Sequence, residues 1–152
     1  MNTRSSKAKG RRLQNWVRDK LRYAFITCWN KLPTLEEDDI KSQTMGMTGE
    51  DIILSPAARK IIPYSFECKN VEKLNIWSTL DQAETNAPDN VTPIAIIKRN
   101  HSKVYVVIEF DAWINSIGGV SEPIQGSSRG ARCGEDDRES NNRTRKERKR
   151  RS

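Results

Sequence analysis

Hydrophobic positions near the start of the chain recur at helical spacing. From Arg11 onward, apolar side chains return every three or four residues on one face, while basic and polar side chains line another. The apolar face consists of Leu13, Trp16, Val17, Leu21, Ala24 and Phe25, and the other face consists of Arg11, Gln14, Arg18 and Arg22. The pattern predicts an amphipathic helix that ends before Pro33, and its basic side either faces solvent or contacts phosphate.

Later segments alternate with a period of two or form short apolar runs, which predicts strands. The expected strands lie in residues 38–43, 50–55, 64–69, 93–100 and 103–110. Residues 104–108 show almost no polar alternation, so we expect a central strand covered on both faces. Ser55 as cap and Pro56 as first residue predict a one-turn helix, and helical patterns also cover 73–86 and 111–117.

The two ends of the chain differ from its middle in composition. Residues 1–10 are small, polar and basic, and residues 118–152 are rich in Gly, Ser, Asn and charged residues. Such segments bury too little apolar area to offset the entropy lost on ordering, so both are expected to be disordered arms. Residues 11–117 then form one expected domain, whose order of elements is typical of an α/β or α+β sandwich.

Charge is distributed unevenly along the 152 residues. The formal net charge is +7, with +5 in residues 1–12 and +6 in residues 140–152, so residues 13–139 are net −4. An acidic body with two basic arms favours a polyanionic partner, above all nucleic acid, over arms that only aid solubility. The terminal run RKERKRR is either a phosphate-binding arm or a nuclear localisation signal.

Several function classes are disfavoured by the composition. No run of 18 apolar residues exists, so we expect no membrane span. The amino terminus has no apolar signal core. The cysteines (Cys28, Cys68 and Cys133) are odd in number and far apart, and only one histidine exists, which favours neither a disulfide framework nor a structural zinc site. We therefore expect a reducing, cytoplasmic compartment.

The strand at 64–69 places two charges on one face. Tyr64, Phe66 and Cys68 form its apolar face, and Ser65, Glu67 and Lys69 form its polar face. Charges on a buried strand are costly unless they are paired or hold a metal. Glu67 and Lys69 are therefore either a self-satisfied pair at a solvated sheet edge or part of a catalytic site.

Asp51 favours the catalytic interpretation. If segment 50–55 lies beside segment 64–69, Asp51 lies next to Glu67, and two carboxylates about 4 Å apart repel by roughly 4 kcal/mol at an intermediate dielectric. A divalent cation relieves this repulsion, and Mg²⁺ takes oxygen ligands from one or two carboxylates plus water and phosphate. Lys69 then orients or deprotonates the attacking water, or offsets charge in the transition state.

These residues resemble the PD-(D/E)XK nuclease superfamily, in which an Asp on the second strand and Glu-x-Lys on the third form a metal site. Asp51, Glu67 and Lys69 match that motif. Over residues 7–111, the chain is similar to small nucleases of tailed bacteriophages described as Holliday junction resolvases, and GEDI, LSPAAR, ECKN and NIW carry the likeness. The resemblance implies a restriction-endonuclease-like α/β core, with a central mixed sheet of about four to five strands flanked by helices.

The resemblance also implies a function. It points to a homodimeric, Mg²⁺- or Mn²⁺-dependent endonuclease that cuts branched DNA, in the host cytoplasm if a phage encodes it. Asp51 and Glu67 would hold the metal, Lys69 would position or activate water, and Gln82 matches a Gln near the site of related resolvases. Archaeal-type resolvases carry a Glu on the first helix, and the candidates for its place here are Gln14, Asp39 and Glu50. The alternatives are a nuclease for linear or damaged DNA and a non-catalytic DNA-binding protein.

Basic and aromatic side chains complete the expected interface. The residues expected to bind DNA are Arg11, Arg12, Arg18, Arg59, Lys60 and Arg99. His101 is either an exposed turn residue or a phosphate contact. Trp77 and Trp113 are expected to pack in the protein rather than stack on bases, and Cys68 is expected to face the core.

Overall fold

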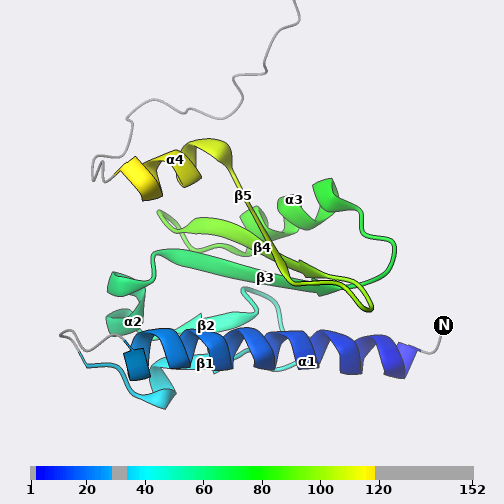
Figure 1. Cartoon of the computed structure of the whole chain (residues 1–152), viewed down its shortest axis with the longest axis horizontal. Helices are drawn as coiled ribbons and strands as arrows, with labels where there is room; N and C mark the ends of the chain where they lie inside the picture. Colours follow the sequence, from blue (N-terminus) through cyan, green and yellow to red (C-terminus); the bar gives the residue numbers. More distant parts are fainter. Residues whose placement is uncertain (1–2, 29–33, 119–152) are drawn as a thin grey trace, which may run out of the picture. The chain divides into compact units, whose positions relative to one another are not determined.

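The computed structural model describes residues 3–28 and 34–118. Pro33, Cys133 and the expected arm beyond Gly118 lie outside the described residues. The elements, shown in Figure 1, are α1 (Thr3–Arg22), η1 (Tyr23–Cys28, a π-helical turn), η2 (Glu37–Asp39, a 3₁₀ turn), β1 (Ile40–Ser42), β2 (Ile52–Leu54), α2 (Pro56–Ile61), β3 (Tyr64–Asn70), α3 (Ile76–Asn86), β4 (Thr92–Lys98), β5 (Tyr105–Ile108) and α4 (Phe110–Gly118).

The mixed α/β architecture expected from the sequence is confirmed, with the strands divided between two small sheets. β3 pairs in parallel with β4, and β4 pairs antiparallel with β5. β1 and β2 form a separate antiparallel pair of three residues each. A backbone hydrogen bond from Asp51 N to Phe66 O (2.8 Å) joins this hairpin to β3. The hairpin therefore lies beside β3 without continuing its ladder.

Helices α1 and α3 contact opposite faces of β3 (Figure 1). Phe66 and Cys68 of β3 join Leu13 and Val17 of α1 in the main hydrophobic core. The alternate residues of β3 point the other way, and Glu67 hydrogen-bonds to α3. Because strand side chains alternate between faces, one strand can build the core and present polar groups at the same time.

Helix α1 begins at Thr3, so residues 3–10 are helical rather than the disordered arm that their composition suggests. Lys, Arg and Ala favour helix, and residues 3–22 contain no proline. Once the amphipathic part is fixed by packing, each further residue adds a hydrogen bond without a new nucleation cost. Asn70 Nδ2 also donates to Lys9 O (3.3 Å), which ties this extension to β3.

The prediction of a central strand at 104–108 is wrong, because β5 lies at an edge of its sheet. Tyr105 and Val106 are 56% and 58% exposed. An apolar run shows what a strand is able to bury and does not show which neighbours will cover it. Helix α4 follows at once, and it also exposes large apolar side chains, namely Phe110, Trp113, Ile114 and Ile117. We refer to these side chains with Tyr105 and Val106 as the β5–α4 surface.

Among the described helices, none is both long and apolar enough to cross a membrane.

Candidate active site

Asp51 is held between the turn before β2 and the edge of β3. Gly49 has a left-handed φ of +106°, which a residue with a side chain adopts only with strain. The Asp51 carbonyl then accepts a hydrogen bond from Gln43 N (2.8 Å). Its carboxylate oxygen Oδ2 accepts another from Cys68 N (2.6 Å). Asp51 thus lies along the edge of β3 that does not pair with β4.

Glu67 and Lys69 form a partnered pair on the α3 side of β3. Glu67 is 3% exposed, and its Oε1 lies 2.7 Å from Lys69 Nζ. The second oxygen, Oε2, accepts a hydrogen bond from Asn86 Nδ2 (3.1 Å). Lys69 Nζ also donates to Gln82 Oε1 (2.8 Å). The burial of Glu67 excludes the interpretation of this pair as a solvated edge contact.

The carboxylates of Asp51 and Glu67 repel one another. Burial raises the pKa of Asp51, and the nearby charge of Glu67 raises that pKa further. The hydrogen bonds from Cys68 N and Gln14 and the charge of Lys69 oppose the shift without cancelling it. Burial likewise raises the pKa of the Cys68 thiol, which leaves it protonated and unsuited to act as a nucleophile.

Helix α1 adds Gln14 to the site. Its Nε2 donates to Asp51 Oδ1 (2.5 Å), and the residue is 6% exposed. Its other amide atom, Oε1, is buried and has no hydrogen-bond partner among the described residues. A buried acceptor without a partner is costly and calls for an explanation. Gln14 Oε1 is thus a neutral oxygen, without a partner among the described residues, close to the Asp51 carboxylate.

This donor set fits a divalent cation. The carboxylates of Asp51 and Glu67 and the amide oxygen of Gln14 are the hard oxygen ligands that Mg²⁺ and Mn²⁺ prefer, and phosphate and water usually fill the other positions. The parts of the chain that the structure describes contain no group of three or more His, Cys, Asp or Glu side chains suited to a metal. A third protein ligand from the described residues around this site would therefore be an amide oxygen rather than an acid.

Asp39 does not reach the position of the missing first-helix acid. Its Oδ2 accepts a hydrogen bond from Glu36 N (2.7 Å), and that backbone contact lowers the pKa of Asp39. The backbone of Asp39 pairs with Ser55, whereas Asp51 is at the opposite end of the same hairpin. Four residues of strand separate Ser55 from Asp51, which corresponds to about 13 Å. Asp39 therefore stabilises the turn before β1.

Arg59 and Glu50 are engaged with one another. Arg59 Nη2 forms an ion pair with Glu50 Oε1, and Nη1 donates to Tyr64 O (2.6 Å). Both side chains are largely buried, and Glu50 Oε2 has no partner among the described residues. The sequence-based assignment of Arg59 to DNA binding is thus corrected: its guanidinium faces inward and holds the residue that precedes Asp51.

Arg59→Ala is expected to lower the free energy of unfolding by about 2 kcal/mol, because it leaves the Glu50 carboxylate buried without its cation. Urea unfolding followed by circular dichroism measures the change. Lys60→Ala is the matched control, since Lys60 is the exposed neighbour on α2, and its effect should stay within about 0.5 kcal/mol. An equal loss in both variants would argue that the ion pair contributes nothing specific.

The other basic residues expected at a DNA interface are exposed or partly exposed. Arg11 Nη1 donates to Gln43 O (2.7 Å), and Arg18 pairs with Asp19 (2.7 Å). Arg12, Lys60 and Arg99 are exposed. These three remain candidates for contact with phosphate.

Two tryptophans differ from expectation. Trp77 is 75% exposed and Trp113 is 44% exposed, so the prediction that both pack in the protein is wrong for the described chain. Trp77 stands in the first turn of α3, and Trp113 belongs to the β5–α4 surface. A sequence pattern indicates that a large apolar residue belongs to a helix, but the tertiary structure decides whether other elements cover its side chain.

Asn86 is the site residue that the sequence-based prediction missed. It lies four residues after Gln82 on α3, so both amides face β3 from successive turns of one helix face. This spacing is a signal that could have identified it.

One comparison with known proteins identifies a family for this chain. No curated protein and no solved structure matches the chain. A family model does match, described as "Phage putative PDDEXK endonuclease", and it covers residues 5–132, a span that includes all the site residues above. Members of PD-(D/E)XK families share a restriction-endonuclease-like α/β fold and generally use divalent metals. The chain therefore belongs to the phage PDDEXK endonuclease family.

Proposed function

We propose that this chain is a divalent-metal-dependent DNA endonuclease that hydrolyses phosphodiester bonds in branched DNA, in the manner of a Holliday junction resolvase. The observation that carries the proposal is the meeting of Asp51, the buried Glu67 and Lys69 beside a buried, unpaired oxygen of Gln14. In a cluster with only a structural role, that oxygen would be expected to have a hydrogen-bond partner. A second carboxylate would also be unexpected there, because the charge of Glu67 raises the pKa of Asp51.

Asp51 and Glu67 are the proposed ligands of Mg²⁺ or Mn²⁺, and the Gln14 amide oxygen is the proposed third ligand. The ion, when bound, supplies Lewis-acid polarisation of the scissile phosphate and offsets the two carboxylate charges. Gln14 takes the place that a first-helix acid has in archaeal-type resolvases. Rotation of its amide group by half a turn exchanges oxygen and nitrogen, so either atom can face Asp51.

Lys69 is the proposed positioning group for the attacking water. Its ammonium has three N–H donors. Glu67 Oε1 (2.7 Å) and Gln82 Oε1 (2.8 Å) engage it within the described structure. The remaining donor is aimed by these two contacts and is available for water or a phosphate oxygen. Gln82 therefore acts through Lys69, by fixing where its charge lies.

Branched DNA is the proposed substrate, and a homodimer in the host cytoplasm is the proposed form of the enzyme. Symmetric cleavage of two strands requires two active sites related by a two-fold axis. The β5–α4 surface supports a second copy as the partner, because β5 has a sheet edge unpaired among the described strands and large apolar side chains lie next to it. Edge strands of this kind pair readily with another chain.

Cleavage of a labelled four-way junction in Mg²⁺ or Mn²⁺, beside a linear duplex of matched sequence, tests the proposal. The wild type is expected to make paired nicks in the junction, and Lys69→Ala is expected to slow cleavage by about 10²- to 10³-fold. Sedimentation equilibrium of the same sample should give a dimer mass. Cleavage of the linear duplex at least as fast would keep the nuclease and discard the junction substrate. Tight binding of DNA without metal-dependent cleavage would instead favour a non-catalytic DNA-binding protein.

A further inference from the structure

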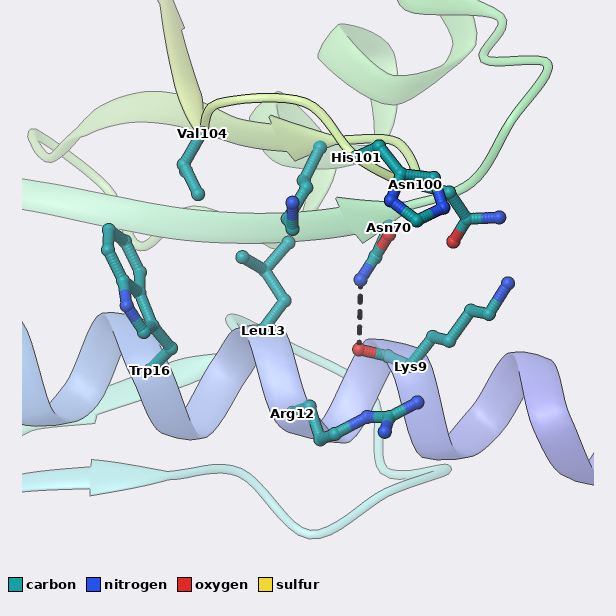
Figure 2. A pocket seen from close by; sticks show the side chains of 9 residues that line it. Lys9, Arg12, Leu13, Trp16, Asn70, Asn100, His101 and Val104 are labelled. Atoms are coloured by element: carbon teal, nitrogen blue, oxygen red, sulfur yellow. Dashed lines mark hydrogen bonds between the residues drawn. The ribbon is translucent and has the colours of Figure 1, made fainter.

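A concave site lies on the α1 side of β3, on the strand face opposite to Glu67 and Lys69. A pocket of about 340 Å³ lies between α1, the end of β3 and the β4–β5 turn (Figure 2). Asn70 lines this pocket and directly follows Lys69, and successive residues of a strand point to opposite faces. The pocket is therefore distinct from the active site, yet both begin at the same end of β3. Its volume is within the range of small-molecule sites.

The floor of the pocket is apolar and includes an accessible aromatic ring. Leu13 and Trp16 of α1 and Val104 before β5 line it. Trp16 is 46% exposed, whereas Leu13, one helical turn earlier, is only 3% exposed. Lys20 Nζ lies over one face of the Trp16 ring, 5.6 Å from its centroid, which leaves the other face for a base. An accessible aromatic ring beside cations is the usual platform on which single-stranded nucleic acids stack a base.

The rim of the pocket is positively charged. Lys9, Arg12 and Lys98 line it, and no Asp or Glu does. Lys9 and Arg12 belong to residues 1–12, which carry a charge of +5, so the pocket places part of this basic segment against a body whose net charge is −4. Lys98 Nζ is committed to Ser102 O (2.6 Å) in the β4–β5 turn. The side chains of Lys9 and Arg12 make no ion pair or hydrogen bond with any described residue, and Figure 2 shows both extending from α1 along the same end of the pocket.

Two amides and an imidazole complete the lining. Asn70 Nδ2 donates to Lys9 O (3.3 Å, dashed in Figure 2), which fixes the amide and leaves its Oδ1 as an acceptor. Asn100 and His101 stand at the mouth of the pocket in the β4–β5 turn. His101 has a left-handed φ of +57°, which histidine adopts more readily than most residues and which shapes the tight turn between β4 and β5. Amides of this kind form hydrogen bonds with base edges.

We propose that this pocket binds one unpaired nucleotide of the DNA substrate, with the base against Trp16 and its phosphate at Lys9 and Arg12. The proposal rests on the DNA substrate proposed above, but it does not depend on cleavage. A base inside a continuous duplex is stacked on both faces and would first have to be unpaired, whereas a nucleotide in a single-stranded flap is already free and one at the crossover of an open junction has lost a stacking neighbour. The pocket thereby gives the enzyme a physical preference for DNA that contains unpaired nucleotides.

Binding measured without metal tests this inference separately from catalysis. The probes are a labelled oligothymidine of about ten nucleotides and a labelled linear duplex, each titrated in EDTA with the full-length chain and followed by fluorescence anisotropy. Trp16→Ala is expected to weaken oligothymidine binding about tenfold and duplex binding less than about twofold. Trp77→Ala is the matched tryptophan control, since Trp77 is 75% exposed on α3, away from the pocket, and it should leave both affinities within about twofold.

A charge variant keeps the proposal testable if Trp16→Ala does not fold, which thermal unfolding will show. Arg12 and Lys7 are both exposed on α1, but only Arg12 lines the pocket. Arg12→Glu should weaken oligothymidine binding several times more than Lys7→Glu does. Equal losses for the two charge variants, or equal losses of single-strand and duplex affinity in Trp16→Ala, would overturn the nucleotide pocket. Cleavage of the junction by the wild type is scored in a separate assay, so the endonuclease proposal can fail while the pocket stands, and the reverse.

Discussion

Glu67→Gln is expected to reduce metal-dependent cleavage of the junction by about 10³-fold or more while DNA binding is retained. The substitution keeps the size of the side chain and removes its charge. Glu67 accepts from Asn86 on one oxygen and faces Lys69 on the other (2.7 Å), so both neighbours present donors to it. An amide has one acceptor end and one donor end, so both contacts remain only if Asn86 rotates its own amide by half a turn. The variant therefore loses a proposed metal ligand and also the charge that strengthens the contact with Lys69.

Cleavage rates under single-turnover conditions and calorimetric titration with Mn²⁺ measure the two losses. Glu84→Gln is the matched control, because Glu84 is an exposed carboxylate on α3, two residues before Asn86. It should cleave within about twofold of the wild type. Cleavage by Glu67→Gln at the control's rate would remove Glu67 from the metal site. Unchanged Mn²⁺ affinity with lost cleavage would restrict its role to positioning Lys69.

The local parts of the fold were predictable because they depend on near neighbours in sequence. Alternation identified β3 and assigned Phe66 and Cys68 to the core, where both are buried. Ser55 accepts a hydrogen bond from Ala58 N (3.1 Å), as its predicted role as helix cap requires. The incorrect predictions concern which other segments pack against a helix or strand. Whether β5 is central and whether residues 3–10 extend α1 depend on contacts between distant segments, which periodicity does not encode.

The candidate site divides in the same way. The motif and its resemblance to a nuclease family named Asp51, Glu67, Lys69 and Gln82, and the structure brings their side chains together. The selection of Gln14 from three candidates required the tertiary structure, because Asp51 and Gln14 are 37 residues apart in sequence. The inward-facing ion pair between Arg59 and Glu50 could not be predicted for a similar reason. An arginine near a site looks the same in sequence whether it binds phosphate or a neighbouring carboxylate.

Asp51→Asn is expected to stabilise the metal-free protein and at the same time to abolish cleavage. An asparagine has the same shape, and its side-chain oxygen can still accept the hydrogen bond from Cys68 N. Its NH₂ group can donate to Gln14 Oε1 once the Gln14 amide rotates by half a turn, which replaces the present hydrogen bond from Gln14 Nε2 to Asp51 Oδ1. The substitution thus removes the repulsion from Glu67 and keeps one hydrogen bond between residue 51 and Gln14. Replacement of a strained functional group in this way typically adds about 1 kcal/mol to the free energy of unfolding.

The stabilisation should depend on pH in a defined direction. The pKa of Asp51 is raised in the folded protein by burial and by Glu67. Below its unfolded pKa, near 3.8, the carboxyl is protonated in both states, and its contribution to stability is fully present. As the pH rises through the higher folded pKa, the group must ionise in an unfavourable environment and that contribution is lost. The advantage of Asp51→Asn should therefore be small near pH 4 and full at neutral pH.

Urea unfolding in EDTA at acidic and neutral pH measures this difference, and repetition with Mg²⁺ measures its coupling to metal. Mg²⁺ at 100 times its Kd should stabilise the wild type by about 2.7 kcal/mol, because it binds only the folded state. Asp51→Asn should gain much less stability from Mg²⁺. The difference in the free energy of unfolding between the variant and the wild type should therefore shrink or change sign when metal is added. A variant that is less stable than the wild type in EDTA at neutral pH would show that the hydrogen bonds from Gln14 and Cys68 outweigh the repulsion. Asp51 would then be a structural carboxylate, and the metal would have to be sought elsewhere.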